Sequence, residues 1–502
     1  MTQLPRLLLV NPRITSRRSA RFPLSLLKLA GALQSRYACR IVDGNVDGSY
    51  LQTTRRLLGA EQFTAVGVTV MGGPQVRSAI EVSTIIRQAA PATPIIWGGY
   101  FPTLYPDTAL NAPYVDYAVR AVGESALVEL LDAIRAGDEA ALESVRGIAW
   151  KRGGRLVRNP DRHMEVRGQE APLPYDLLGD PRIYLARTFL GRRTAAHQAS
   201  VGCRFRCTFC GVAAMFRGAT GLPPALRLER ELTWLKDDLG ADSIQYFDHN
   251  FFDREKDMVP LLEVLARVQL PWWCYARADA LLGLSASSWA LVRKSRLRMA
   301  YIGAESPNDA MLKSIRKGTT ADQTLAVADL CRRQGVIPEL SFMVAPPVDT
   351  ENETERTFEF IREVKRINPL AEIIVYIYTP LPPSALPENS RARAAVPLDL
   401  TGEPLRFPSS PEEWTRQQWV DYACHADAPW LNDRLRMRIR SFVTVLGCRF
   451  PTVQDVRAPA WSKLTLRALA SWRYRFRRYD QPWELDLSRK LIRLAEPRVS
   501  GI

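Results

Sequence analysis

At 502 residues the chain is too long for one ordinary hydrophobic core, so we expect two or three domains. Hydrophobic residues make up 46% of the chain and charged residues 24%, a normal globular composition, and no apolar run reaches the length of a membrane span. The formal net charge is +15, but no nucleic-acid-binding motif accompanies it, so we expect no nucleic-acid partner. Eight cysteines without an export signal at the N-terminus predict a reducing compartment, hence the cytoplasm.

Residues 1–135 alternate strand and helix patterns, which predicts an α/β domain with a doubly wound, Rossmann-like parallel sheet. The predicted strands cover 6–10, 40–44, 65–70, 93–99 and 114–124, with helices at 24–34 and 76–89. Ligands of such sheets lie beyond the carboxyl ends of the strands, where glycine lets a flat ligand approach the backbone closely. Those ends carry Gly72, Gly73, Gly98, Gly99 and Gly123. Tight turns are the alternative explanation for these glycines.

Histidine is scarce and is missing from this first domain. The four histidines of the chain are His163, His197, His249 and His425. If the sheet binds a metal-centred macrocycle, its own loops therefore supply no imidazole as the lower ligand.

Residues 136–196 are predicted to be a linker with a β-hairpin around Gly153-Gly154. A second series of strands and helices follows over 197–385 and predicts a partial (β/α)6 barrel, whose reactive groups belong at the C-terminal strand ends. The predicted strands are 197–202, 243–248, 272–276, 299–305, 339–345 and 372–378, with helices such as 227–239 and 322–335 between them.

Three cysteines stand together just after the first of these strands, with the spacing C-x3-C-x2-C: Cys203, Cys207 and Cys210. A structural zinc site uses four ligands, usually as two separated pairs, and a disulfide would leave one thiol over. An iron–sulfur cluster takes thiolates readily, and a cubane with three protein ligands keeps one iron open to a small molecule. We therefore expect a [4Fe-4S] cluster; a zinc-stabilised binding protein without turnover is the alternative from another class.

With Phe209 placed between the last two cysteines, this motif resembles the radical S-adenosylmethionine (SAM) superfamily. The resemblance implies that the open iron chelates the amino and carboxylate groups of SAM. An electron, supplied by an external donor such as flavodoxin or ferredoxin, then breaks the sulfonium C–S bond. The product is a 5′-deoxyadenosyl radical, which takes hydrogen from an unactivated carbon.

Further segments are similar to this superfamily in their order along the chain. The resemblance implies that Asp248 lies near the methionine part of SAM, that Arg277 stands at the third strand, and that Glu305 and Ser306 hold ribose hydroxyls. The expected cofactor contacts on the barrel are thus Phe209, Asp248, Arg277, Glu305 and Ser306.

The chain also departs from the superfamily pattern at three places. His249-Asn250 replaces the rest of the acidic pair, Ala345 stands where glycine is usual, and Pro383-Ser384 replaces a Pro-Gly-Thr segment. These departures put the details of the SAM contacts in question.

The segments 97–110 and 115–125 resemble the cobalamin-binding domain that precedes the barrel in one branch of the superfamily. That branch includes the anaerobic magnesium-protoporphyrin ester cyclase, many C- and P-methyltransferases and hopanoid-modifying enzymes. The Asp-x-His-x-x-Gly signature of histidine-ligated cobalamin proteins is missing, so the resemblance implies cobalamin without a histidine lower ligand. The expected contacts are Thr69, Val70, Gly72, Gly98, Gly99 and Gly123.

Residues 386–502 are rich in proline, tryptophan and arginine and predict a mostly helical region, with helices at 411–424 and 428–445. Trp414, Trp419 and Trp430 would line a substrate pocket or pack in an ordinary core. Residues 464–480 interleave arginine with large apolar residues, which is typical of a solvated amphipathic helix or of a surface that meets an anionic partner such as a membrane.

Together these features predict a cobalamin-dependent radical SAM enzyme that methylates an unactivated carbon of a small, hydrophobic or lipid-like substrate. Radical oxidation or ring formation with the same cofactors, without methyl transfer, is the alternative. His249 and His425 are candidate acid or base groups, or structural histidines.

Overall fold

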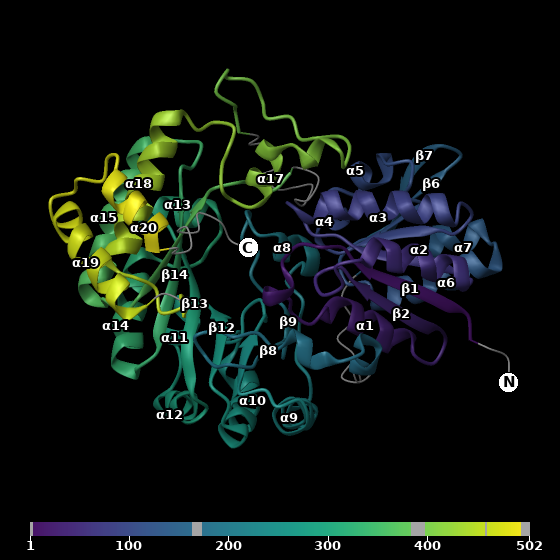
Figure 1. The fold of residues 1–502 in the computed structure, drawn as a ribbon, viewed down its shortest axis with the longest axis horizontal. Helices are drawn as coiled ribbons and strands as arrows, with labels where there is room; N and C mark the ends of the chain where they lie inside the picture. The colour runs from purple at the N-terminus through teal and green to yellow at the C-terminus, as the bar shows by residue number, and fades with distance from the viewer. Residues whose placement is uncertain (1–3, 163–172, 383–396, 457–458, 493–502) are drawn as a thin grey trace.

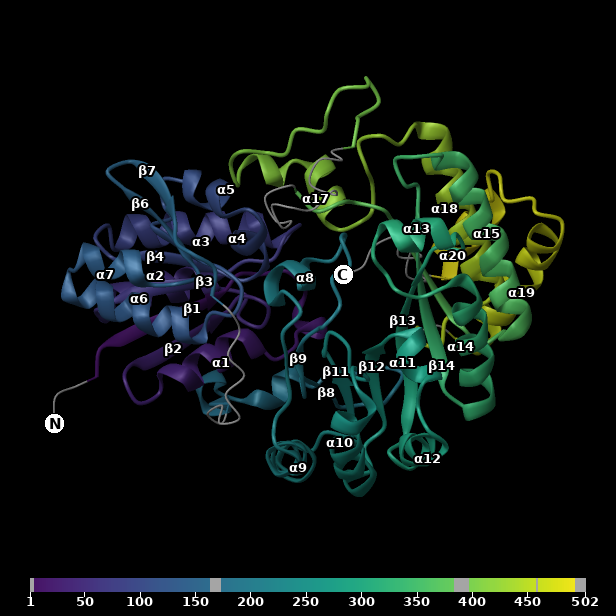
Figure 2. The ribbon, with the colours of Figure 1, turned by 180° about the vertical axis from the view of Figure 1, so that it is seen from behind.

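The computed structural model describes residues 4–162, 173–382, 397–456 and 459–492 (Figure 1). Two α/β bodies lie side by side, and the last helices cover the second body at the end of the molecule farthest from the first (Figures 1 and 2). This is the predicted α/β architecture of a Rossmann-like domain, a partial barrel and a helical C-terminal region. The predicted domain boundaries stay predictions, and His163 and Pro383-Ser384 lie outside the described residues.

The first domain is a seven-stranded sheet with helices on both faces. Its strands are β1 (Arg6–Asn11), β2 (Ala38–Asp43), β3 (Ala65–Thr69), β4 (Ile95–Gly98), β5 (Tyr117–Val119), β6 (Ile148–Arg152) and β7 (Arg155–Arg158). Its helices are α1 (Leu24–Leu33), α2 (Tyr50–Ala60), α3 (Gln75–Ala89), α4 (Tyr100–Leu104), α5 (Pro106–Asn111), α6 (Glu124–Ala136) and α7 (Glu139–Ser144). The strand order is β2-β1-β3-β4-β5-β6-β7.

Strands β1 to β5 run parallel, and all of them except the half-exposed edge strand β2 are largely buried. In β1, Leu7 and Leu9 pack with α1 and α6, whereas Leu8 and Val10 pack with α2 and α3. Because helices cover both faces, each short strand is apolar at nearly every position, which is the pattern that the sequence showed.

Strands β6 and β7 form the hairpin predicted at Gly153-Gly154, where both glycines have positive φ angles of 52° and 80°. Strand β6 pairs antiparallel with β5. The hairpin therefore extends the first sheet.

The second domain is an open sheet of six parallel strands in the order β8-β11-β12-β13-β14-β15. The strands are β8 (Thr194–His197), β11 (Ser243–Tyr246), β12 (Trp272–Ala276), β13 (Leu297–Glu305), β14 (Ile337–Val344) and β15 (Glu372–Ile377). The helices are α8 (Gly211–Phe216), α9 (Ala225–Thr233), α10 (Glu255–Val268), α11 (Ala278–Leu282), α12 (Ala286–Lys294), α13 (Asp309–Ser314), α14 (Ala321–Gln334) and α15 (Thr350–Ile367). Helix α9 continues as a π-helical turn over Trp234–Asp238.

The first barrel strand lies earlier than the sequence predicted, because β8 ends at His197 instead of starting there. The backbone N–H groups of Ala199 and Ser200 donate to the carboxylate of Asp248, at 2.8 and 2.6 Å. These donors are therefore lost to the sheet, and the chain continues as a short ribbon of β9 (Val201–Gly202) with β10 (Thr220–Gly221).

The C-terminal region holds α17 (Gln417–Ala423), α18 (Asp433–Arg449), α19 (Ala460–Arg475) and α20 (Trp483–Ile492). The helix predicted from 428 starts only at Asp433, because the Asn432 side chain caps it by accepting from the N–H of Leu435 at 2.8 Å. Helix α18 packs on α15 of the barrel, where the rings of Phe358 and Phe442 stack at 3.8 Å. Among the helices described, none is both long and apolar enough to span a bilayer.

Trp414 and Trp419 belong to the apolar core of the first domain, together with Phe101. This confirms the core interpretation for these two tryptophans. Trp430 is only partly buried, and its indole N–H donates to the carbonyl of Ala345 on the barrel at 2.9 Å. The region around α17 therefore connects the two domains.

Candidate cofactor site between the two domains

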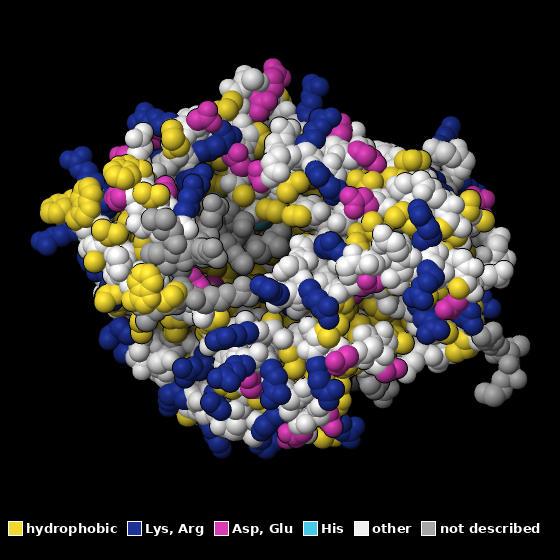
Figure 3. All heavy atoms as spheres, viewed as in Figure 1, with side chains coloured by type: hydrophobic (Ala, Val, Ile, Leu, Met, Phe, Trp, Pro, Cys, Tyr) yellow, Lys and Arg dark blue, Asp and Glu magenta, His cyan; other side chains and the backbone are white. Residues whose placement is uncertain are grey.

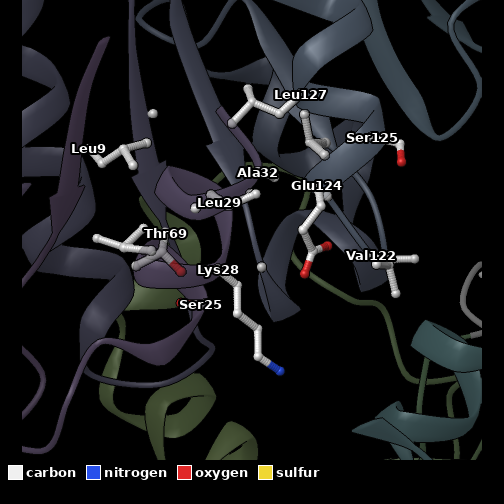
Figure 4. A pocket seen from close by; sticks show the side chains of 18 of the residues that line it. Leu9, Ser25, Lys28, Leu29, Ala32, Thr69, Val122, Glu124, Ser125 and Leu127 are labelled. Atoms are coloured by element: carbon white, nitrogen blue, oxygen red, sulfur yellow. The ribbon is translucent and has the colours of Figure 1, made fainter. Parts of the chain in front are cut away.

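A cavity of about 670 Å³ lies at the carboxyl ends of the first domain's strands and opens toward the barrel (Figure 4). Its inner part is apolar and lies between the sheet and helices α1 and α6, with Leu9, Leu26, Ile96 and Leu127 among its walls. Toward the opening, Lys28 of α1 and Glu124 of α6 point into the same space (Figure 4). Size and lining are those of a site for an organic ligand with a polar periphery.

The structure brings four of the six expected cobalamin contacts to this cavity: Thr69, Gly98, Gly99 and Gly123. A Cβ added to Gly98 would meet only the carbonyl of Val119, at 3.9 Å, so glycine keeps this floor open. Gly99 has a φ of 99°, a conformation that favours glycine.

The other two expected contacts lie elsewhere. Val70 is fully buried in the domain core, and its N–H donates to the carbonyl of Gly98 at 2.8 Å. Gly72 lies against α17, where an added Cβ would meet Ala423 at 3.6 Å. Neither lines the cavity, because β3 ends at Thr69 and the chain then turns away.

Several lining residues were not expected from the sequence. Ser25, Lys28, Leu29 and Ala32 of α1 border the cavity at the three- and four-residue spacing of one helix face. That spacing was visible in the sequence, but nothing local shows that the face borders a cavity. The barrel contributes Gln198, Val201, Met215, Phe216 and His249.

His249 is the histidine that reaches this cavity from the barrel. Its Nδ1 accepts a hydrogen bond from the N–H of Gly202 at 3.1 Å. Burial, with a contribution from Lys28, lowers the pKa of His249 to about 4, so the ring is neutral at neutral pH. A neutral ring that accepts at Nδ1 carries its proton on Nε2, and neither nitrogen then offers a lone pair to a metal.

The three clustered cysteines lie on the loop between β9 and α8, which begins at Gly211. Cys207 is buried, and Cys203 and Cys210 are partly buried. Burial, together with the neighbouring thiols of Cys207 and Cys203, raises the pKa of Cys210 to about 11. The structure therefore brings the three thiols together in a place where bare thiolates are unfavourable and a cationic metal group would stabilise them.

Among the described residues, no three His, Cys, Asp or Glu side chains converge as the ligands of a single metal ion would. In a cubane each cysteine binds a separate iron, so the thiols surround a space and do not meet at one point. The donor set of three neighbouring thiols fits a cluster.

Arg277 holds the cysteine loop in place. Its guanidinium lies 3.5 Å from the centre of the ring of Phe205, a residue that stands between the first two cysteines of the motif. It also bonds both carboxylate oxygens of Asp279, at 2.9 and 3.1 Å, and donates to the carbonyl of Lys317 at 2.6 Å. The Nε and Nη2 groups of Arg277 thus donate to the protein itself.

Phe209 and Asp248 also support this loop. Phe209 packs against Leu312 and Met343. Asp248 is fully buried and accepts hydrogen bonds from the backbone of Ala199 and from the backbone and hydroxyl of Ser200. Burial raises the pKa of Asp248 to about 6, although these hydrogen bonds lower it.

Glu305 and Ser306 lie at the end of β13, on the rim of the barrel. The carboxylate of Glu305 pairs with the buried Nζ of Lys317 at 2.6 Å. The backbone φ angle of Glu305 is 65°. A Cβ on Gly303 would meet the Glu305 carboxylate at 2.1 Å, so this pair depends on glycine at 303. The Ser306 hydroxyl accepts from the N–H of Asn308 at 3.0 Å. Lys317 and Gly303 were not expected from the sequence.

The inner face of the barrel is aromatic and accessible. Tyr275, Tyr301 and Tyr376 are partly exposed, whereas Cys274 and Ile302, which point outward, are buried. The hydroxyls of Tyr301 and Tyr376 share a hydrogen bond. Closed barrels are filled by side chains, so partly exposed inward residues indicate room for a small molecule.

Helix α8 connects the cysteine loop to the cavity. It starts one residue after Cys210, and its residues Met215 and Phe216 line the cavity. The cluster site and the cavity therefore lie at opposite ends of one short helix.

Family models match both domains. The B12 binding domain model matches residues 12–131, and the radical SAM superfamily model matches residues 198–361. The first match contains the cavity's glycines and the second contains the three clustered cysteines.

Two relatives are similar to this chain over more than half of its length. An uncharacterized methyltransferase of Pyrococcus horikoshii is 25% identical over 68% of this chain and 73% of its own length. An anaerobic magnesium-protoporphyrin IX monomethyl ester cyclase of Synechocystis is 23% identical over 57% of this chain and 55% of its own length.

The radical SAM methyltransferase TsrM of Kitasatospora setae, solved with cobalamin and a [4Fe-4S] cluster, has the same fold. Its TM-score is 0.65 at 18% identity, covering 97% of this chain and 100% of that one. The chain thus contains a B12 binding domain and a radical SAM domain, and the cofactors that these two domains imply are SAM, a [4Fe-4S] cluster and cobalamin.

Proposed function

We propose that the protein is a cobalamin-dependent methyltransferase that acts on an unactivated carbon of a hydrophobic small molecule. The observation that carries this proposal is that helix α8 adjoins the cysteine loop at one end and the cavity at the other. Methyl transfer to carbon needs the methyl donor and the radical source to reach one substrate atom, and α8 places the cavity beside the cysteine loop. The methyltransferase relative of Pyrococcus supports the same activity.

When bound, the cluster with SAM would supply radical chemistry and cobalamin would supply the methyl group. We propose that Cys203, Cys207 and Cys210 hold the cluster. For cobalamin we retain Thr69, Gly98, Gly99 and Gly123, which line the cavity, and withdraw Val70 and Gly72.

The remaining proposed roles are divided between contact and support. Glu305 and Ser306, on the barrel rim, would face the SAM ribose, with Lys317 fixing the Glu305 carboxylate. We propose that Asp248 and Arg277 are positioning residues: Asp248 binds the backbone of Ala199 and Ser200, just before the cysteine loop, and Arg277 lies over the Phe205 ring within it. Phe209 packs the same loop against the barrel.

The substrate would enter the barrel interior, where Tyr275, Tyr301 and Tyr376 are partly exposed. Their rings favour an apolar or aromatic body, and their hydroxyls offer hydrogen bonds to a polar substituent. The electron would come from an external donor such as flavodoxin or ferredoxin.

Oxidation or ring formation without methyl transfer is the second candidate, because the cyclase of Synechocystis is similar to this chain over 57% of this chain's length. The two are distinguished by incubating the reduced holoenzyme with SAM that carries an isotopic methyl label. Label in the product supports methylation. A changed product without label, formed while SAM is cleaved, contradicts methylation and supports the second candidate.

A further inference from the structure

Helix α19 has a second apolar face that the fold does not use. Its buried face, with Ser462, Leu466 and Ala470, packs against α18 and α20. With about 3.6 residues per turn, residues on the opposite side form a continuous stripe along the helix. We call this the apolar stripe: Trp461, Leu464, Trp472 and Phe476, with exposed fractions of 66%, 68%, 50% and 65%.

The neighbouring helix enlarges this surface. On α20, Trp483 and Leu487 are one turn apart and are 69% and 52% exposed. Figure 3 shows large hydrophobic side chains projecting, with basic side chains next to them, at the edge of the molecule where α19 lies in Figure 1. A cluster of large exposed apolar side chains on one surface is uncommon unless it binds a partner or a membrane.

The exposed charges of α19 itself are all positive; acidic residues follow it, of which Asp480 pairs with Arg438 and Glu484 with Arg473. Residues 460–475 contain two exposed lysine or arginine side chains, Arg467 and Arg475, and no Asp or Glu. Arg478, just beyond the helix, is also exposed. An anionic surface complements these arginines, whereas a second copy of the chain would place arginine against arginine. A nucleic acid would satisfy the arginines but leave the tryptophans and leucine in water.

We propose that the apolar stripe and its three arginines dock the protein on the surface of an anionic lipid membrane. Tryptophan, phenylalanine and leucine flanked by arginine are the residues with which interfacial helices enter the headgroup layer. Each basic residue near an anionic surface adds to the attraction, and salt weakens this contribution. Because α19 lies at the opposite end of the molecule from the first domain, docking leaves the cofactor cavity free (Figures 1 and 2).

The test is flotation of the full-length holoenzyme with vesicles of phosphatidylcholine, with and without phosphatidylglycerol. The stripe variant carries Trp461→Ser, Trp472→Ser and Phe476→Ser. The charge variant carries Arg467→Gln, Arg475→Gln and Arg478→Gln. The matched control removes three apolar side chains of similar exposure elsewhere, through Leu226→Ser, Val348→Ser and Leu400→Ser.

We expect binding to the anionic vesicles, a loss of roughly 100-fold in the charge variant and at least about tenfold in the stripe variant. The control variant binds like the unchanged protein, and high salt reduces binding. Equal binding by all four proteins, or none by the unchanged protein, overturns the proposal.

Two further results would also overturn it. One is light scattering that shows a dimer which only the stripe variant converts to a monomer, without vesicle binding. The other is competition by DNA that survives loss of the stripe. The charge variant leaves the packed face of α19 intact, so the test stands if the stripe variant fails to fold.

Discussion

Tyr100 of the first domain lies directly against Gly211 of the barrel, so closely that a Cβ at position 211 would come within 2.0 Å of the tyrosine hydroxyl oxygen. Tyr100 follows Gly99 on the cavity floor, and Gly211 follows Cys210. One contact thus joins the loops that we assign to cobalamin and to the cluster. Burial raises the pKa of Tyr100, which stays neutral and packs as an aromatic ring.

Gly211→Ala is therefore expected to push the cysteine loop away from the first domain. Overpacking of this kind costs about 1–3 kcal/mol. Both cluster content and corrinoid retention should fall, as measured by iron analysis and by visible absorbance. Adding Tyr100→Ala should restore both, because it removes the atoms that clash. Gly59→Ala, where an added Cβ meets nothing within 4 Å, is the control; equal losses in that variant would contradict the contact.

Replacing any one of Cys203, Cys207 and Cys210 by alanine should reduce iron and acid-labile sulfide after anaerobic reconstitution to the level of the triple variant, because a cubane needs all three thiolates. Cleavage of SAM should disappear with the metal. Cys448→Ala, which removes a buried thiol from α18, serves as the control and should keep the full complement. Full iron content in the triple variant would refute the cluster assignment.

Gly98→Val should weaken corrinoid binding at least about tenfold, because its side chain would project into the open part of the cavity floor. Gly72→Ala should bind corrinoid normally, since Gly72 faces α17 and not the cavity. Titration of the apoprotein with hydroxocobalamin, followed by absorbance, measures both. If Gly72→Ala loses binding while Gly98→Val keeps it, our assignment of the floor is reversed.

His249→Gln should retain the corrinoid, because the bond from the Gly202 N–H to Nδ1 leaves the ring without a free lone pair. The electron paramagnetic resonance spectrum of bound cob(II)alamin should show no splitting from a lower nitrogen ligand, in the unchanged protein and in the variant alike. A nitrogen splitting that disappears on substitution of His249 would identify it as a ligand after all.

Glu339 should make stability depend on pH. Burial raises its pKa to about 7, although its carboxylate accepts hydrogen bonds from Trp273 and Gln454. The folded state thus holds this proton more tightly than the unfolded state, where the pKa is near 4.5. The stabilisation is complete below about pH 4.5 and is lost as the pH rises through 7, a decrease of order 3 kcal/mol in the free energy of unfolding.

Urea denaturation at several pH values, compared between the unchanged protein and Glu339→Gln, isolates this contribution from other groups such as Asp248. The variant should show a flatter pH profile, since its amide does not titrate. Parallel profiles for the two proteins would show that Glu339 titrates normally.

Much of the fold follows from local patterns. The strands of the first domain lie within a few residues of their predicted places. A strand that helices cover on both faces is a short apolar run, and such a run is visible in the sequence without knowledge of its neighbours. The first barrel strand was misplaced because its end depends on Asp248, about 50 residues away. The residues of the strand itself give no sign of a hydrogen-bond partner so far away in the sequence.

The candidate site divides in the same way. Some site residues could be predicted from short stretches of sequence, because a loop motif or a turn spans only a few residues. These are Cys203, Cys207, Cys210 and the glycines at the strand ends. Arg277, by contrast, was expected to contact a cofactor, and only the structure shows that its Nε and Nη2 bind Asp279 and Lys317 and that it lies over the Phe205 ring.

The sequence alone determined the order of domains, the three-thiol motif and the lack of an imidazole in the first domain, because each depends on neighbouring residues or on composition. Only the tertiary structure decided that α8 connects the cysteine loop to the cavity, that Val70 and Gly72 lie outside it, and that α19 faces the solvent with tryptophans. The physical reason is that these features arise where segments hundreds of residues apart pack together, and packing across that separation is set by the whole chain.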